Sequence, residues 1–318
     1  MRVIWGTTDI TNYITSIKWG GSKSQVARKL EIEIVNAPYD PNIKALNIKL
    51  ADKLYLFEDD SMKTELFRGF VVTRERDSQS GSVSYTAYDL CYYTIKSSAT
   101  YNFKNKTAET ITQVVCDDLQ IPTGSLAKTG HKQKLLVKNC KIYDIIMKAY
   151  TQAHQVDGED YMVKALKGKL CVVKYGATIC TNKLVEGSNV TRATFKETLD
   201  KMVNRVRIYD GDGKQIGVVS NSSNIKNYGV FQQTYTKEKG KNATTTAKSK
   251  FHGVDKTAKI EAIGFTQAVT GNGIVIQDGA TGLKGLFWIT EDTHKWVKGV
   301  HTMTLSLEFK KSMDAKEV

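Results

Sequence analysis

The chain has 318 residues, of which 41% are hydrophobic and 25% are charged, and its formal net charge is +13. This apolar content supports packed cores and excludes wholesale disorder, and at roughly 150 residues per domain the length predicts two to three domains. No apolar run approaches the roughly 18 residues that span a bilayer. The first residues lack the apolar segment of a signal peptide, so we expect cytoplasmic synthesis without classical export.

Residues 1–98 predict a first β domain. Leu30, Ile32 and Ile34 alternate with charged residues, which is the period of two of a strand with one buried face. Glycine, a short β-branched and aromatic run, a charged tip and a second alternating arm then follow over residues 66–90. That layout predicts a β-hairpin that closes the domain.

Residues 99–180 predict a small α/β module. Apolar side chains recur at helical spacing over residues 107–119, and Thr107 is placed to cap the free N–H groups of that helix. A second amphipathic helix is predicted over residues 142–153. Two short strands, at residues 161–166 and 169–175, complete the module.

Residues 181–312 predict a second β domain. The motif Asp210-Gly-Asp-Gly213 is a hairpin turn between strands at 202–209 and 216–219. A short helix over residues 242–251 indicates a helical insertion at about 237–257 within this domain. We expect the polar end of the chain, residues 313–318, to be a flexible tail.

The clearest pattern in the chain is a hairpin over residues 285–309. Its second arm places Met303, Leu305 and Leu307 on one face and polar residues on the other. The segment 66–90 has the same layout, give or take one residue. Either the chain contains one β unit twice, or a β-rich chain holds two unrelated hairpins.

Cysteines and histidines indicate neither a disulfide framework nor a metal centre. The five cysteines form no CxxC pair, and their odd number favours reduced, mostly buried thiols. The five histidines show no zinc-ligand spacing. We therefore expect no metal and no cofactor. The cysteines are Cys91, Cys116, Cys140, Cys171 and Cys180.

Two carboxylate pairs are the only candidates for catalysis. Glu159 with Asp160, or Glu197 with Asp200, could serve a glycosidase, but each lies in a polar or turn-like context typical of solvated charge. Nucleophile and phosphate-loop motifs are absent. The sequence therefore assigns no catalytic residues, and it favours a structural or assembly role over an enzyme.

Two lysine-rich stretches concentrate the positive charge. Residues 128–141 carry five lysines and no acid, and residues 237–250 carry five lysines against Glu238 alone. They are either solvated loop surface or an electrostatic dock for an acidic protein or for nucleic acid.

Several short phrases, in this order along the chain, resemble the baseplate hub proteins of PBSX-like prophages and R-type bacteriocin particles, which are related in fold to the hub of T4-type contractile tails. The resemblance covers about residues 2 to 310. The phrases are Ala27-Arg-Lys-Leu-Glu31, Leu66-Phe-Arg-Gly69, Tyr85-Thr-Ala-Tyr-Asp89, Thr129-Gly130, Ile142-Tyr-Asp144, Gly168-Lys-Leu170, Met202-Val-Asn-Arg-Val206, Ile208-Tyr-Asp210 and Thr281-Gly-Leu-Lys-Gly-Leu-Phe287.

The resemblance implies a mainly β fold with an α+β insertion: two tail-tube-like β-barrel or sandwich domains, a small α/β module and a short helical insertion. It implies a homotrimer that joins the tail tube, or its initiator, to the central spike and lines the channel. Other baseplate proteins would be further partners. The particle would be a virion or a tailocin, assembled in the bacterial host cytoplasm.

The resemblance identifies no interface residues. Polar residues such as Thr302, Thr304 and Ser306 either line the channel or face solvent. Because lysines in a channel would hold DNA phosphates, either the lysines face outward or the particle carries no DNA. A tail-associated cell-wall hydrolase and a nucleic-acid-binding protein stay as alternatives. We expect no membrane insertion and no specific nucleic acid.

Overall fold

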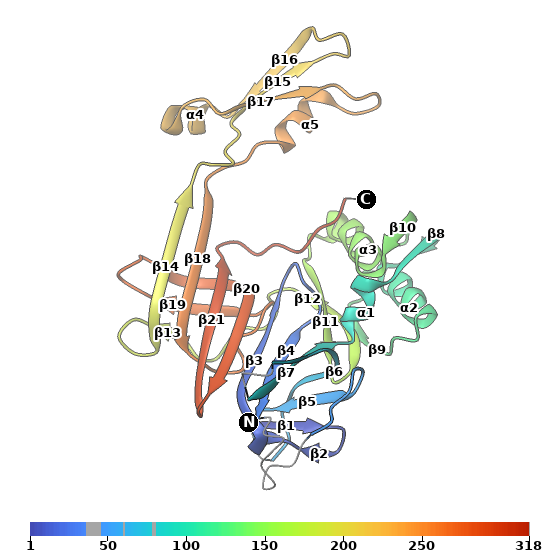
Figure 1. Ribbon diagram of the computed structural model, residues 1–318. Coiled ribbons are helices and arrows are strands. Elements are labelled where there is room, and N and C mark those ends of the chain that lie inside the picture. Colours follow the sequence, from blue (N-terminus) through green and yellow to red (C-terminus); the bar gives the residue numbers. More distant parts are fainter. Residues whose placement is uncertain (36–45, 60, 78–80, 318) are drawn as a thin grey trace. The chain divides into compact units, whose positions relative to one another are not determined.

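The computed structural model describes residues 1–35, 46–59, 61–77 and 81–317. The chain forms two compact units: Met1–Thr194 with Lys259–Val318, and Phe195–Ala258. The first unit is built on one long sheet, whose strands and neighbouring helices are labelled in Figure 1. Within the described residues, no helix is both long and apolar enough to cross a membrane.

The N-terminal β region supplies seven strands of the long sheet. Inward-facing Leu30, Ile32 and Ile34 belong to its hydrophobic core, as their alternation predicts. The elements are β1 (Arg2–Trp5), β2 (Thr8–Asp9), the 3-10 turn η1 (Thr11–Tyr13), β3 (Ile14–Ser22), β4 (Lys29–Val35), β5 (Lys53–Phe57), β6 (Glu65–Arg76) and β7 (Ser82–Asp89).

The α/β module follows. Its hydrophobic core is a separate cluster, formed mainly by the inner faces of its helices. Both predicted helices are confirmed, and the Thr107 side chain accepts a hydrogen bond from the Thr110 N–H at the start of the first. The elements are α1 (Cys91–Lys96), β8 (Ser98–Lys106), α2 (Ala108–Asp118), β9 (Thr123–Leu126), β10 (Gln133–Lys141), α3 (Ile142–Asp157), β11 (Tyr161–Leu166) and β12 (Lys169–Lys174).

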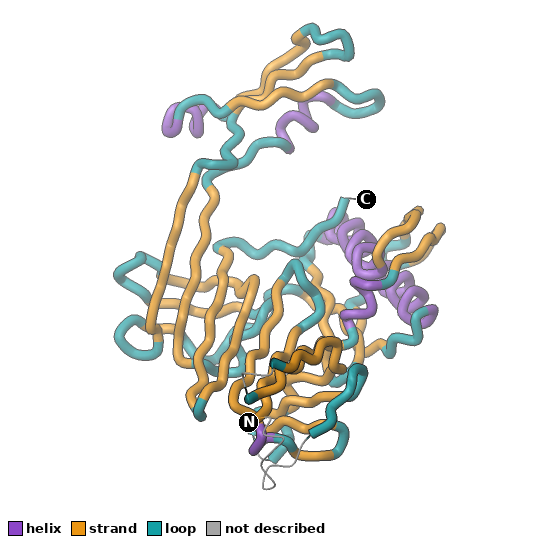
Figure 2. The backbone as a smooth tube through the Cα atoms, in the orientation of Figure 1, coloured by secondary structure: helices purple, strands orange, loops and turns teal. Residues whose placement is uncertain are grey.

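The C-terminal β region completes the long sheet. Its elements are β13 (Leu184–Val185), β14 (Val190–Thr198), β18 (Asp255–Ile263), β19 (Gly273–Gln277), β20 (Lys284–Val297) and β21 (Val300–Glu308). The main path of the sheet runs β14-β18-β21-β20-β3-β4-β7-β6-β5-β1-β2, and β13 and β19 pair off that path. The two β regions therefore meet edge to edge, through the antiparallel pair β20 and β3 (Figure 2).

The two hairpins with the same sequence layout are both formed. β20 and β21 are joined by Lys298 and Gly299, which both have positive φ, as a two-residue turn that matches strand twist requires. The pair β6 and β7 is also antiparallel. Each pair has one register shift near the middle, at Val72 in β6 and at Thr290 in β20. Other strand pairs of the chain have register shifts too, so the shared shift fits both a duplicated unit and two unrelated hairpins.

The second unit is a three-stranded sheet with one helix packed on it, and its core includes Val206, Ile208, Tyr235 and Ala247. The Asp210 carboxylate accepts from the N–H groups of Asp212 and Lys214, which fixes the predicted turn. Its elements are β15 (Arg205–Tyr209), β16 (Gln215–Ser220), α4 (Ser222–Tyr228), β17 (Gln232–Thr236) and α5 (Ala243–Ser249).

This unit is larger than the helical insertion that the sequence predicts at about 237–257. That segment contains α5 and the first residues of β18, while the hairpin β15–β16 and strand β17 belong to the same compact unit as α5. The sequence pattern shows each strand but not its partner. Because Val206 and Val219 face α5 instead of the long sheet's core, the whole stretch folds as one insertion.

The end of the chain also differs from the expected flexible tail. The Met313 side chain is buried, and its N–H donates to the Asp160 carboxylate. The Tyr143 hydroxyl donates to Asp314, and the Lys316 N–H donates to the Thr151 hydroxyl. Residues 310–317 are therefore held against the module, chiefly along α3.

Candidate functional site: a polar sheet face above a buried junction

One face of the long sheet is mainly polar across the line where its two β regions meet, with Val297 and Val300 as apolar residues at one end of β20 and β21. Strand register places the side chains of six strands directly opposite one another, and all of them are half-buried or exposed. The row at the centre of this face is Thr302, Lys295, Lys18, Glu31, Thr86 and Thr73, from β21 to β6. We call the face that contains this row and its neighbours the polar face.

The polar face also contains two of the residues that the sequence leaves between channel and solvent. Thr304 lies opposite Thr293, and Ser306 lies opposite Glu291. Towards the module the face ends at Phe70 and Tyr88, which stack on the α1 tyrosines Tyr93 and Tyr92. The sequence alone does not reveal that β21 shares this face with β3 and β4, because β20, the strand between β21 and β3, pairs with a segment about 270 to 280 residues away.

Charge on the polar face is close to balanced, in contrast to the +13 of the whole chain. Paired lysines and glutamates account for part of this balance: Lys18 lies 3.1 Å and Lys29 lies 2.9 Å from the Glu31 carboxylate. Glu33 accepts from the hydroxyls of Ser16 and Ser82. The charged residues in these rows are Lys18, Lys29 and Lys295 against Glu31, Glu33, Glu75 and Glu291.

Beneath the polar face, the junction of β3 and β20 is unusually close. A side chain at Gly20 would collide with the backbone carbonyl of Asp292 on the neighbouring strand. Only glycine fits here, and its absence of a Cβ lets the two β regions approach.

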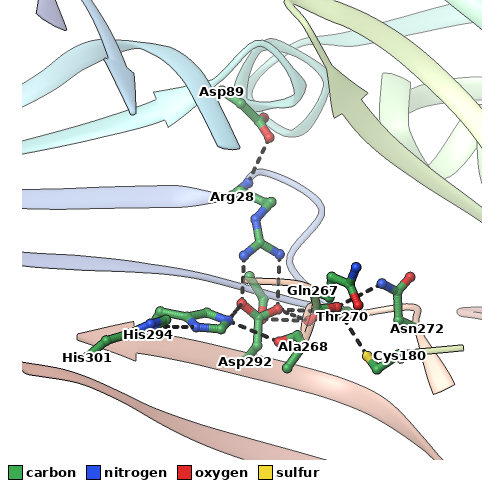
Figure 3. A network of polar contacts seen from close by, with 11 residues as sticks. Arg28, Asp89, Cys180, Gln267, Ala268, Thr270, Asn272, Asp292, His294 and His301 are labelled. Atoms are coloured by element: carbon green, nitrogen blue, oxygen red, sulfur yellow. Dashed lines mark hydrogen bonds and ion pairs between the residues drawn. The ribbon is translucent and has the colours of Figure 1, made fainter. Parts of the chain in front are cut away.

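A buried ion pair fixes this junction from below. Both terminal nitrogens of Arg28 donate to the Asp292 carboxylate, over 3.0 and 2.6 Å (Figure 3). Asp292 is fully buried and accepts two more hydrogen bonds, from the Thr270 N–H and hydroxyl. Burial alone would raise the pKa of Asp292, but the Arg28 charge and these hydrogen bonds hold that pKa below its usual value.

The network continues from Arg28 to the end of β7. The Arg28 guanidinium lies 4.1 Å from the centre of the Trp19 ring, and its backbone N–H donates to the buried Asp89 carboxylate. Asp89 also accepts from the Cys91 N–H at the start of α1. Burial raises the pKa of Asp89 to about 7, against the opposing effect of these hydrogen bonds and of Arg28.

Two histidines extend the network under β21. Because the Ala268 carbonyl can only accept, the His294 Nε2 carries the proton of that 3.0 Å hydrogen bond. His294 Nδ1 then accepts from His301 Nε2, also over 3.0 Å. Burial lowers the pKa of both rings, and the neighbouring His294 helps to lower that of His301 to about 4. Both histidines are therefore neutral at pH 7.

The residues of the two candidate carboxylate pairs make contacts with other groups. Glu159 pairs with exposed Lys174, whereas the buried Asp160 carboxylate accepts from the N–H of Met313. Glu197 pairs with Lys256, and the amide N–H of Asp200 is bonded to Thr198. Each carboxylate is accounted for by a structural contact or by exposure. Within the described residues, no group of three or more potential ligands could hold a metal ion.

The lysine-rich stretches differ from each other in structure. Residues 133–141 are strand β10, paired with β8, so this part is not the loop that the sequence suggests. Exposed Lys134 and Lys138 flank buried Leu135 and Val137 on β10, and the residue between these two is exposed Leu136. Residues 237–250 contain α5 and an exposed loop. Of the five cysteines, four are buried, and Cys140 is half-buried.

Comparison with known proteins agrees with this architecture. A family model described as YQBQ-like matches residues 17–308. The chain belongs to the YQBQ-like family. One relative, the phage-like element PBSX protein XkdQ of Bacillus subtilis, is 30% identical over 94% of this chain and 93% of its own length. The resemblance to PBSX-like prophage proteins is thereby confirmed.

Solved structures with the same fold are tail proteins and a secretion component. The prophage MuSo2 43 kDa tail protein of Shewanella oneidensis has a TM-score of 0.73 at 14% identity, covering 96% of this chain and 97% of that one. The E. coli protein c3393, a type VI secretion component described as similar to the T4 tail proteins gp27 and gp5, has a TM-score of 0.54 at 8% identity, covering 94% and 74%. The mainly β, tail-hub-like fold is therefore confirmed.

Proposed function

We propose that this protein is the structural baseplate hub of a prophage-type tail particle. In this role it is a homotrimer that joins the tail tube to the central spike, contacts other baseplate proteins and lines the channel. The observation that carries the proposal is the polar face, which extends across two β regions that each contain the same kind of hairpin. Family membership and the fold shared with tail proteins support the same role.

Symmetry explains why such a chain suits this position. Three copies of a chain with two similar hairpins present six similar hairpins around one axis. A threefold spike can then meet one side of the ring and a sixfold tube the other. The domain division into residues 1–98, 99–180 and 181–312 belongs to this proposal, with residues 195–258 as an insertion in the last.

The charge distribution is compatible with a channel. Lysines facing a lumen would hold DNA by its phosphates. On the polar face, however, the three lysines are outnumbered by four glutamates. The basic excess lies elsewhere, for example in the second unit and on β10. The sequence leaves open whether lysines face the channel, and this arrangement favours lysines on outward surfaces.

Solution mass tests the assembly. Light scattering over a concentration series, with and without the spike protein of the same particle, should give three times 35.5 kDa or a complex of three chains with three spike chains. A monomer under both conditions would contradict the trimeric hub.

A cysteine placed on the polar face tests the channel separately. Thr302→Cys should react in the free chain with a maleimide attached to a polymer wider than DNA and be protected in the assembled complex, because such a reagent cannot enter a channel that admits DNA. Thr244→Cys, on the exposed face of α5, is the matched control, and wild type reports labelling of the native thiols. Equal labelling of Thr302→Cys before and after assembly would place the polar face outside the channel.

A further inference from the structure

A cavity of about 180 Å³ lies between the first β region and the α/β module, and the hub role does not account for it. Its floor is formed by Trp19 and Arg28, and its wall by β11 residues that include Lys164. It shares several lining residues with a neighbouring cleft of about 460 Å³ that reaches the tip of the β11–β12 hairpin.

The polar groups around this cavity are donors in excess of acceptors. Within the described residues, the Lys164 ammonium has neither an ion pair nor a hydrogen bond. The indole Nε1 of Trp19 and the Nε of Arg28 are buried without a hydrogen-bond partner. Buried donors are normally paired in folded proteins, so the two buried unpaired donors, from Trp19 and Arg28, call for an acceptor, and the ammonium of half-buried Lys164 lies on the same cavity.

A charge count shows what kind of acceptor fits. The Arg28 guanidinium is neutralised by Asp292, and the one carboxylate in the cavity wall, Glu65, is bound by both Arg68 nitrogens. Lys164 is left with one unbalanced positive charge. Burial and the nearby Arg28 charge lower the pKa of Lys164, because both disfavour its charged form. A single negative charge would restore the balance.

The remaining lining is apolar and comes from Val26, Leu66, Met162 and Val269. A cavity of about 150 Å³ holds one benzene molecule, so this one accommodates about four to six carbon atoms beside a polar head. Phosphate or sulfate would carry a second charge and leave the apolar wall without contacts. We propose that this cavity binds one carboxylate on a short apolar chain, with Lys164 as its ionic partner.

Two sources share this chemistry: a free short-chain carboxylic acid, or a glutamate side chain of a partner polypeptide. Calorimetric titration of the full-length chain with butyrate, at constant ionic strength, tests the first. Butyramide has nearly the same shape without the charge and should not bind. N-acetyl-glutamate amide, compared with N-acetyl-glutamine amide, tests the second.

The matched variants are Lys164→Met and Lys169→Met, which remove one lysine each from the same hairpin. Because a charge-assisted hydrogen bond is lost, Lys164→Met should weaken carboxylate binding about tenfold or more, and Lys169→Met should not. Lys164→Met should also melt at the same or a higher temperature than wild type, since it removes a desolvated charge. Retained structure is thus checked in the same experiment.

A nuclear magnetic resonance titration of the Lys164 ammonium gives an independent measurement. Its pKa should rise when butyrate is added and stay unchanged with butyramide. Binding of butyrate alone would indicate a free acid as the occupant, and binding of the glutamate derivative would indicate a partner side chain. If neither carboxylate binds, or if sulfate competes equally well, the proposal is overturned. None of these outcomes depends on trimer formation.

Discussion

One ion pair lies on each face of the sheet near the β3–β20 junction, and the two pairs differ mainly in burial. Below the junction, Asp292 is 0% exposed and binds Arg28 through two hydrogen bonds. Above it, Lys18 and Glu31 are 49% and 33% exposed. Removing one partner of a buried pair leaves an uncompensated charge, whereas exposed pairs contribute little. The buried pair therefore fixes how the two β regions meet, and the exposed pair sets the charge of the polar face.

The largest effect should come from breaking the buried pair. Asp292→Asn keeps the shape but leaves the Arg28 charge buried without its counterion, so we expect a loss of about 3–5 kcal/mol in the free energy of unfolding. Urea denaturation of the first unit's transition measures this. Glu31→Gln, on the polar face, is the control and should lose less than about 1 kcal/mol. Similar losses in both variants would show that burial does not separate the two pairs.

A second effect, smaller and dependent on pH, concerns Asp89 at the far end of the buried network. Its folded-state pKa of about 7 lies above the unfolded value, so the folded state binds more protons in between. Stability from this residue is complete below about pH 4 and is lost as the pH rises through 7, by at most about 4 kcal/mol. In Asp89→Asn, the urea midpoint of unfolding should no longer show this decline as the pH rises. His301, with a pKa near 4, acts in the opposite direction below pH 6.5, so wild type must be compared with the variant at each pH. Parallel profiles would contradict the assignment to Asp89.

The local sequence pattern correctly predicts most of the strands and helices around the buried and the exposed ion pair. Alternation in β4 and in β21 predicts which residues are buried, and Thr107 correctly predicts the start of α2. Strand β10 was missed because lysines surround its two inward residues, so its composition is typical of a loop. The extent of the insertion was also missed, since strand partners are not written in the alternation of any one strand.

The buried network was missed for a related reason, although the sequence contains one indication of it. Asp292 and His294 occupy the inward positions of a strand whose outward positions are polar as well, and they lie opposite Leu305 and Met303. Charged residues on the apolar side of a strand require partners. Those partners, Arg28 and Thr270, come from segments that only the folded chain brings together, and no spacing along the sequence reveals them.

The smallest effect on stability is expected on the polar face, where it separates structure from function. Glu31→Lys exchanges the carboxylate between Lys18 and Lys29 for a third positive charge, and because all three side chains reach solvent the free energy of unfolding should change by about 1 kcal/mol at most. The charge change itself matters more for a channel than for stability.

If the polar face lines the lumen, assembled particles with Glu31→Lys should retain DNA more strongly at low salt, and the difference should disappear as salt is added. Glu197→Lys, which breaks the exposed pair with Lys256 outside the polar face, makes the same charge change and is the control. Equal DNA retention by the two variants would mean that only the net charge of the particle matters. The polar face would then not line the channel, even if the trimer forms.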